Sequence, residues 1–127
     1  MSKTVVQTIH APKAIGMYSQ GIIFQNLVFT SGQIPINPEN GKLVENDFTL
    51  EVHQVLKNVN AVLKGGGSSL KSALKLTVFL TDLSFFQEVN EVFNDYFPND
   101  PPARSIVQIS ALPMSARIEI EAVGFIQ

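Results

Sequence analysis

The hydrophobic and polar positions of the chain follow two periods, and the change between them separates strands from helices. In the first part of the chain, apolar runs are short and are separated by polar or glycine-containing loops, which is typical of strands. Three strands are predicted there, at residues 4–9, 21–24 and 27–32. Residues 33–42 contain two prolines and an Asn-Gly pair, so a loop is predicted because proline interrupts a hydrogen-bonded ladder.

The central part of the chain contains two segments with a helical period. Apolar residues between 52 and 63 recur at spacings of three and four, which places them on one helical face. Glycines 65–67 end this helix, since glycine accepts the left-handed geometry of a helix C-terminus. A second helix is predicted to begin at Asp82 and Ser84, with Gln87 at capping-box spacing from Ser84, and to stop at the PNDPP segment.

Alternation returns between the two helices and after the second one. One face of residues 70–80 is predicted to carry Leu70, Leu74, Leu76, Val78 and Leu80, with lysines and threonines opposite. This period of two predicts a half-buried strand of about 10 residues. Two further strands are predicted at 103–109 and 116–126. The predicted order is therefore β-β-β-α-β-α-β-β, which makes one α+β domain over residues 1–127.

Two helices can cover only one face of a sheet of about six strands. The other face would carry Thr77, Phe79 and one side of each C-terminal strand. Because 45% of the residues are hydrophobic, several strands exposed on this face would form a large apolar patch in water. We therefore expect the chain to associate with copies of itself through this face. Sedimentation as a monomer at micromolar concentration would contradict the expectation.

Composition excludes several classes of function. The net charge is −2 and no cluster of lysine or arginine stands out, so binding to nucleic acid is not expected. There is no cysteine, and His10 and His53 lack partners at ligand spacing, so no metal site is expected. No signal peptide and no apolar run of about 20 residues is present, which indicates a cytoplasmic protein without a membrane partner.

Arg104 is the most informative candidate for chemistry, because it is one of only two arginines and it begins an apolar strand. A guanidinium holds a carboxylate through two parallel hydrogen bonds, so Arg104 could bind a small carboxylate substrate. The alternative is a structural ion pair with Glu119 or Glu121, which are close in sequence. Taken alone, its position supports both interpretations equally.

Glu119 alternates with the apolar residues of the last predicted strand. A carboxylate in a closed site can activate water as a general base, whereas a member of a solvated charged face has no such role. Tyr18 and Ser31 lie in loop or strand-end positions, and Gly32 lets the backbone approach a ligand closely. Asn90, in the second helix, is either a buried hydrogen-bonding amide or a pocket contact.

As a set, these residues resemble the RidA/YjgF family of enamine/imine deaminases. Its order and spacing are reproduced by AIGMYSQG, FTSGQIPINPENGKLV, VLKNVNAVLKGGG, KLTVFLTDLSFFQEVNEVFNDYF, PPARSIVQI and LPMSARIEIEAVGF, which cover nearly the whole chain. The PARS segment followed by an IEIEA strand is the specific part. The resemblance implies a chorismate-mutase-like fold, with a mixed sheet backed by two helices. It also implies a homotrimer with three clefts at subunit interfaces.

The resemblance also implies the activity and the site. By similarity, Arg104 is the carboxylate-binding arginine and Glu119 is the glutamate that positions the hydrolytic water. Tyr18 is implied as a catalytic residue beside these two, and the implied substrate-binding residues are Ser31, Gly32, Asn90 and Ile106. The implied reaction is hydrolysis of 2-aminoacrylate, 2-iminopropionate and related 2-imino acids to 2-keto acids and ammonia, without a metal or cofactor. A non-catalytic, 2-keto-acid-binding regulatory trimer is the alternative, because an anchoring arginine serves both functions.

The chain departs from the family pattern at three positions. Ile106 replaces a frequent cysteine, Met17 replaces a proline before the tyrosine, and Gln108 stands where glutamate is common. The contact expected from position 106 is made by the backbone, which isoleucine retains. These departures leave the rate and the substrate range open.

Overall fold

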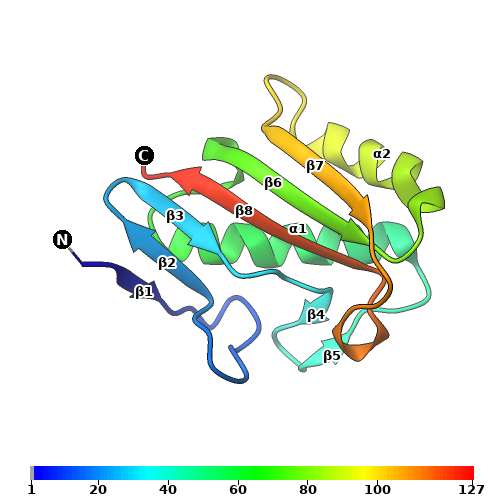
Figure 1. Ribbon diagram of the computed structural model, residues 1–127, viewed down its shortest axis with the longest axis horizontal. Helices are drawn as coiled ribbons and strands as arrows, with labels where there is room; N and C mark the ends of the chain where they lie inside the picture. Colours follow the sequence, from blue (N-terminus) through cyan, green and yellow to red (C-terminus); the bar gives the residue numbers. More distant parts are fainter. Residues whose placement is uncertain (1) are drawn as a thin grey trace.

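A computed structural model describes residues 2–127 and contains a six-stranded mixed sheet with two helices on one face (Figure 1). In spatial order the strands are β1 (Thr4–Val6), β2 (Gly21–Phe24), β3 (Leu27–Thr30), β8 (Ile118–Phe125), β6 (Ala73–Leu80) and β7 (Ala103–Gln108). Only β6 and β7 pair in parallel, because α2 (Phe86–Tyr96) connects them; the other neighbours are antiparallel. The predicted α+β class and the predicted order of the main elements are confirmed.

The core lies between the sheet and α1 (Phe48–Gly65). The helix begins at Asp47, whose side chain accepts a hydrogen bond from the Leu50 backbone N–H at 3.2 Å. Its predicted apolar face is fully buried, and the helix packs chiefly against β8, α2 and β3; the buried residues are Val52, Val55, Leu56, Val59, Val62 and Leu63. No helix within residues 2–127 is long and apolar enough to cross a membrane.

Part of the segment predicted as a loop forms a second, small sheet. Strands β4 (Ile36–Asn37) and β5 (Lys42–Leu43) pair antiparallel. The prolines lie just outside β4 and therefore interrupt no ladder, while Gly41 has a φ of 72°, which suits the turn between the two strands. The prolines indicated the ends of the strand and not its absence.

The predicted strand over residues 70–80 is shorter than expected. Leu70 begins a buried 3₁₀ turn, Leu70–Ser72, and the strand starts at Ala73. The register against β8 shifts between Ala73 and Lys75, so Leu74 is an extra residue and lies 47% exposed. The prediction that Leu74 shares the buried face was wrong because a bulge reverses the alternation. The first predicted strand, at 4–9, likewise ends at Val6.

The start of the second helix also differs from the prediction. Asp82 accepts a hydrogen bond from the Ser84 backbone N–H at 2.8 Å and begins a 3₁₀ turn, Leu83–Phe85. Helix α2 starts only at Phe86 and has no side-chain cap. The Ser84–Gln87 capping box is therefore not formed; a carboxylate two residues before Ser84 supplies the local cap instead.

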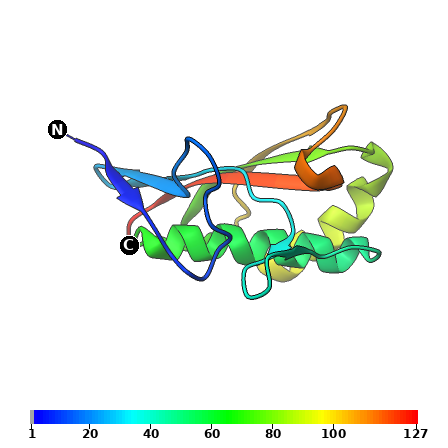
Figure 2. The ribbon, with the colours of Figure 1, turned by 90° about the horizontal axis from the view of Figure 1, so that it is seen from below.

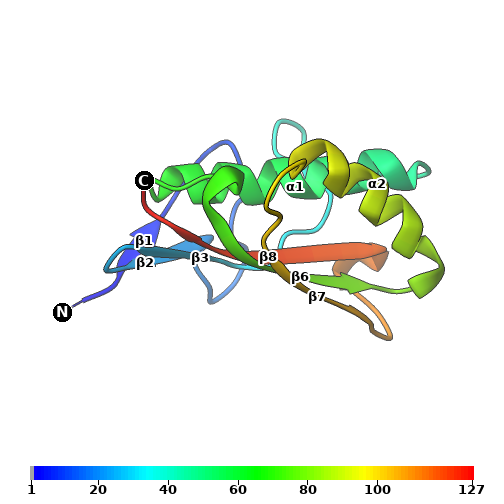
Figure 3. The ribbon, with the colours of Figure 1, turned by 90° about the horizontal axis from the view of Figure 1, so that it is seen from above.

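The face of the sheet opposite the helices is not covered by any helix or strand of residues 2–127 (Figures 2 and 3). Alternation along the strands places several large apolar side chains on this open face. Those with the greatest exposure are Val5 at 51%, Phe29 at 41%, Val107 at 42% and Phe125 at 39%. An uncovered face was predicted, and association through it stays a prediction.

Candidate functional site

Four of the predicted site residues line one groove of about 710 Å³ at the edge of the open face. These residues are Tyr18, Ser31, Gly32 and Glu119, and we call this region the glutamate groove. Glu119 reaches it from β8, Ser31 and Gly32 follow β3 directly, and Tyr18 comes from the loop before β2. Glu121, Lys13 and Met114 also line the groove.

Backbone bonds fix the segment after β3 against β8. The Gln33 N–H donates to the Ile120 carbonyl at 2.9 Å, and the Ile120 N–H donates to the Gln33 carbonyl at 3.0 Å. As a result, Gly32 lies directly against the Glu119 side chain: a Cβ at this position would lie 2.5 Å from Glu119 Oε2. Only glycine therefore leaves the carboxylate where it is.

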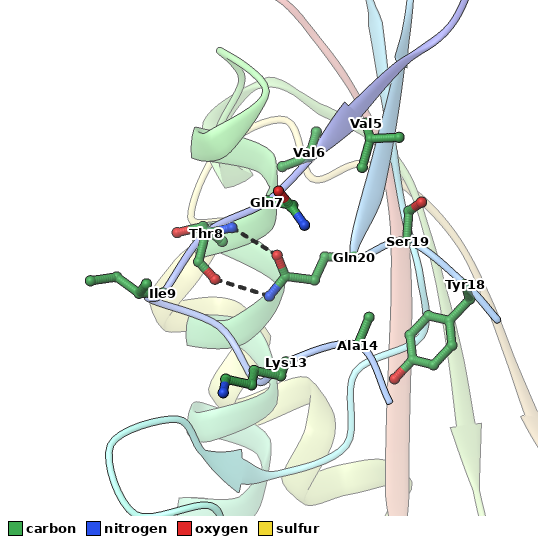
Figure 4. A pocket seen from close by; sticks show the side chains of 10 residues that line it. All are labelled: Val5, Val6, Gln7, Thr8, Ile9, Lys13, Ala14, Tyr18, Ser19 and Gln20. Atoms are coloured by element: carbon green, nitrogen blue, oxygen red, sulfur yellow. Dashed lines mark hydrogen bonds between the residues drawn. The ribbon is translucent and has the colours of Figure 1, made fainter. Parts of the chain in front are cut away.

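The loop before β2 is held by side-chain hydrogen bonds. Ser31 Oγ donates to the Ser19 carbonyl at 2.5 Å, while the hydroxyl of the half-exposed Tyr18 accepts from the Ile15 N–H at 3.3 Å. Figure 4 shows the buried Gln20 side chain directed at Thr8, whose N–H and carbonyl it bonds at 2.7 and 3.0 Å. This arrangement fixes the base of the loop and leaves the Tyr18 ring at the groove.

The electrostatics of the groove make Glu119 a stronger base than an exposed glutamate. Burial raises the pKa of the Glu119 carboxyl above its ordinary value, and the nearby negative charge of Glu121 raises it further. A carboxylate with a raised pKa that faces a groove can accept a proton from water more readily.

Arg104 and Asn90 line a different pocket, of about 400 Å³, which we call the arginine pocket. Its other walls are Phe93, Asn94, Phe97, Pro101 and Pro102. Arg104 Nη1 donates to Asn90 Oδ1 at 2.8 Å, and its Cζ lies 5.5 Å from the Phe86 ring centroid and 5.3 Å from that of Phe93. The amide and the two rings orient the guanidinium.

The alternative that Arg104 forms a structural ion pair with Glu119 or Glu121 is not observed. Within residues 2–127 the only salt bridge joins Arg117 to Glu51, at 2.5 Å. Apart from the bond to Asn90, the donors of the Arg104 fork therefore have no protein acceptor in this part of the chain. The guanidinium has the capacity to bind a carboxylate from outside the chain.

Arg104 and Glu119 do not meet within one chain. Arg104 pairs with Leu76 and Glu119 with Phe79, so they project from opposite faces of the sheet. They are separated by two strand spacings of about 4.8 Å and by three residues of about 3.3 Å each along the strands. Ile106 shares the face of Arg104, where it packs partly buried against the core.

Two groups of contacts were missed by sequence reasoning. Phe86 and Phe93 hold the Arg104 guanidinium, and this contact requires the position of α2 beside β7. The bridge between Gln33 and Ile120 leaves no local signal in the sequence. The place of Glu121 beside Glu119 was available from strand alternation alone.

Fold and geometry together define a class of small α+β chain. A partly buried carboxylate lies on one face of the sheet, and the guanidinium on the other face has no ion pair within residues 2–127. Residues 8–126 match the family model described as Endoribonuclease L-PSP. The chain is 46% identical over 124 residues to Reactive Intermediate Deaminase A, chloroplastic, of Arabidopsis thaliana, which covers 98% of this chain and 66% of that protein. It is 42% identical over 122 residues to the human 2-iminobutanoate/2-iminopropanoate deaminase, covering 96% and 89%.

A solved structure agrees with these relatives. The Rid-family protein YyfA from Yersinia pestis superimposes with a TM-score of 0.95 at 46% identity, covering 98% of this chain and 100% of that one. The chain belongs to the RidA/YjgF family. The predicted resemblance and the predicted fold are thereby confirmed.

Proposed function

We propose that this protein is an enamine/imine deaminase that hydrolyses 2-aminoacrylate, 2-iminopropionate and related 2-imino acids to 2-keto acids and ammonia. The observation that carries the proposal is an Arg104 guanidinium oriented by Asn90 with no carboxylate partner in residues 2–127. The names of the Arabidopsis and human relatives support the reaction class.

The residues divide the reaction between them. The substrate carboxylate accepts two hydrogen bonds from the Arg104 fork, which fixes the adjacent imine carbon. Glu119 accepts a proton from a water molecule, whose oxygen bonds to that carbon. Glu119 returns this proton to the nitrogen and then passes on the proton of the new hydroxyl group. Ammonia leaves with the electron pair of the C–N bond, and a 2-keto acid remains. The 2-imino acid and one water thus give one keto acid and one ammonia.

The remaining predicted residues shape the site. Tyr18, Ser31 and Gly32 form the groove wall around the water and the imine, and Asn90 orients the anchor. Ile106 lies in β7, an edge strand, whose outer backbone groups are available to a ligand whatever the side chain. This supports the proposal that isoleucine replaces the frequent cysteine without loss of the contact.

The complete site is proposed to form between copies of the chain. Because the glutamate groove and the arginine pocket lie on opposite faces of one sheet, a second copy must bring its arginine pocket to the groove. A homotrimer closes such contacts into a ring with three identical clefts and covers the open face. The exposed Val5, Phe29, Val107 and Phe125 supply apolar surface for this association.

The test generates the substrate in place. A serine or threonine dehydratase produces the enamine, and keto-acid formation is followed spectroscopically with the wild type, with Arg104→Ala, with Lys42→Ala as an exposed-cation control, and without protein. We expect the wild type and Lys42→Ala to accelerate the reaction. In Arg104→Ala the acceleration of keto-acid formation should fall by about ten-fold or more, which corresponds to the loss of one charge-assisted hydrogen bond. Sedimentation should show that the oligomer of this variant is intact.

Absence of acceleration by the wild type would refute the deaminase proposal. Saturable binding of 2-ketobutyrate in that case would favour the regulatory trimer. The family description also names an endoribonuclease. With a net charge of −2, salt-dependent RNA binding is not expected, and a filter-binding titration at two salt concentrations tests this separately.

A further inference from the structure

The glutamate groove contains a second carboxylate that the proposed reaction does not use. Glu121 lies two residues from Glu119 on the same face of β8, with their Cα atoms about 6.6 Å apart. Both side chains line the groove. The negative charge of Glu121 also contributes to the raised pKa of Glu119. The two carboxylates therefore face the same small space.

No cation of this chain neutralises the pair in the described part of the sequence. Lys13 and Tyr18 are the other titratable groups of the groove, and neither forms an ion pair or hydrogen bond with Glu119 or Glu121. Lys75 lies diagonally across from Glu121 on β6, but its Nζ donates to Ser105 Oγ on β7, at 3.2 Å. The groove thus presents negative charge to whatever enters it.

A 2-imino acid brings the matching charge. Its carboxylate is negative, while its protonated nitrogen carries a positive charge two bonds away. The keto-acid product has the same carboxylate and carbon frame, with a neutral carbonyl oxygen in place of the nitrogen. An arginine anchor alone does not discriminate between them, whereas an unneutralised carboxylate beside the reacting carbon does.

We propose that Glu121 binds the protonated nitrogen of the substrate, so that the site selects the iminium form over the keto-acid product. The inference rests on the proposed deaminase function and deepens it. Glu119 takes the proton of the attacking water while Glu121 holds the C=NH₂⁺ group, which is the more electrophilic form. Glu119 passes both protons of the water to the nitrogen in turn. When the C–N bond breaks, the nitrogen leaves as ammonium, and the keto acid has no further attraction to Glu121.

The experiment compares Glu121→Gln, which removes the charge at constant shape, with Glu121→Asp, which keeps it. Glu45→Gln, at an exposed position outside the groove, is the matched charge control. Each protein is assayed for kcat/KM on the enzymatically generated imine. L-alanine and pyruvate then serve as competitive inhibitors, since they share a carbon frame and differ in the cationic nitrogen.

We expect Glu121→Gln to lower kcat/KM and the affinity for alanine by about ten-fold each, which corresponds to the loss of one charge-assisted hydrogen bond. Inhibition by pyruvate should be unchanged. Glu121→Asp should retain part of the activity and Glu45→Gln all of it. The acidic limb of the pH profile should move to lower pH in Glu121→Gln, because Glu119 loses a negative neighbour.

Three outcomes would overturn the proposal. A kcat/KM equal to that of the wild type in Glu121→Gln would show that the negative charge of Glu121 does not contribute to the reaction. Parallel losses for alanine and pyruvate would show that the variant only disturbs the shape of the groove. No acceleration by the wild type would refute the deaminase function and this inference with it, which distinguishes that failure from the first two.

Discussion

The position of the Glu119 side chain depends on residue 32 being a glycine. The Glu119 carboxylate occupies the space that a Cβ on residue 32 would need. The Gln33–Ile120 bridge prevents the backbone of residue 32 from moving away. Glu119, the proposed general base, can therefore occupy this position only because Gly32 has no side chain.

Gly32→Ala should separate activity from stability. The atoms that a new methyl group meets are at the end of the flexible Glu119 side chain, so we expect the carboxylate to rotate and the melting temperature to change little. Misplacement of a catalytic group by about 1 Å can cost about 100-fold in rate, so kcat/KM should fall by roughly 10- to 100-fold.

Gly21→Ala is the contrasting variant. Its Cβ would meet Val62 Cγ1 at 2.7 Å and the Phe29 carbonyl oxygen at 3.0 Å, so it should lower the melting temperature. A Gly32→Ala protein with wild-type kcat/KM would show that the position of the carboxylate is not critical.

The raised pKa of Glu119 gives a signed pH dependence. The base must be ionised, so kcat/KM should fall as pH decreases through a value above 4.5, the ordinary value for this group. Stability has the opposite sign: ionised Glu119 costs the folded state free energy once pH exceeds the unfolded-state pKa, and the cost is complete above the folded-state pKa.

Glu119→Gln should therefore be more stable than the wild type near pH 7, and the difference should vanish as pH falls below about 4.5. Thermal unfolding of both proteins between about pH 4 and pH 8 checks this. A stability difference that grows towards acid pH would contradict the assigned shift.

At the scale of residues, the sequence was sufficient to select candidate functional side chains. It was not sufficient to predict which side chains contact one another. Arg104 was notable for its rarity and Glu119 for its place in an alternating strand. That Asn90, Phe86 and Phe93 hold Arg104 depends on how α2 lies beside β7. No pattern in the local sequence indicates a contact between residues so far apart along the chain.

At the scale of elements, the entry to β8 is fixed by a pair of opposite charges. Glu51, in the first turn of α1, is 2% exposed and accepts hydrogen bonds from Arg117, whose guanidinium lies 5.4 and 5.0 Å from the Phe48 and Phe85 ring centroids. Arg117 immediately precedes β8 and thus joins this strand to α1 and to the 3₁₀ turn before α2.

Arg117→Leu should destabilise the protein more than Glu51→Leu, because it leaves a buried carboxylate without its partner. Since the Arg117 side chain is 37% exposed, we expect a loss of about 2–3 kcal/mol, below the range for fully buried pairs. The double variant should recover part of the loss. Urea unfolding of the three variants measures these values; equal losses in the two single variants would contradict the asymmetry.

Helix positions were predictable because the buried face of α1 repeats every three to four residues over most of its length. The β4–β5 pair and the bulge at Leu74 were not, since each depends on the partner strand. A short strand between prolines and a single extra residue leave the local hydrophobic pattern almost unchanged.

At the scale of the whole molecule, the proposed site requires two copies. If one copy supplies Arg104 and the next supplies Glu119, mixed oligomers of Arg104→Ala and Glu119→Gln contain some clefts with both wild-type groups. Random co-assembly in equal amounts restores up to about one quarter of the clefts of a cyclic trimer. We expect that fraction of wild-type activity after the two inactive variants are unfolded and refolded together.

Mixing the folded variants without refolding is the control, and we expect no activity on the time scale of a short assay if intact oligomers keep their subunits. Sedimentation of the mixture establishes its assembly state. Trimers that stay inactive after co-refolding would place both groups of each site in one copy, against the separation of the two pockets in the fold.

The place of β8 between β3 and β6 has a consequence for how the protein is made. This strand follows every other element in chain order, so α1 and β6 leave the ribosome well before the strand that packs against α1 and pairs with β6. A nascent chain needs protection from aggregation during that interval. Because Glu119 lies on β8, the proposed general base is placed in the same event that completes the sheet, and an unfinished chain lacks the proposed hydrolytic site.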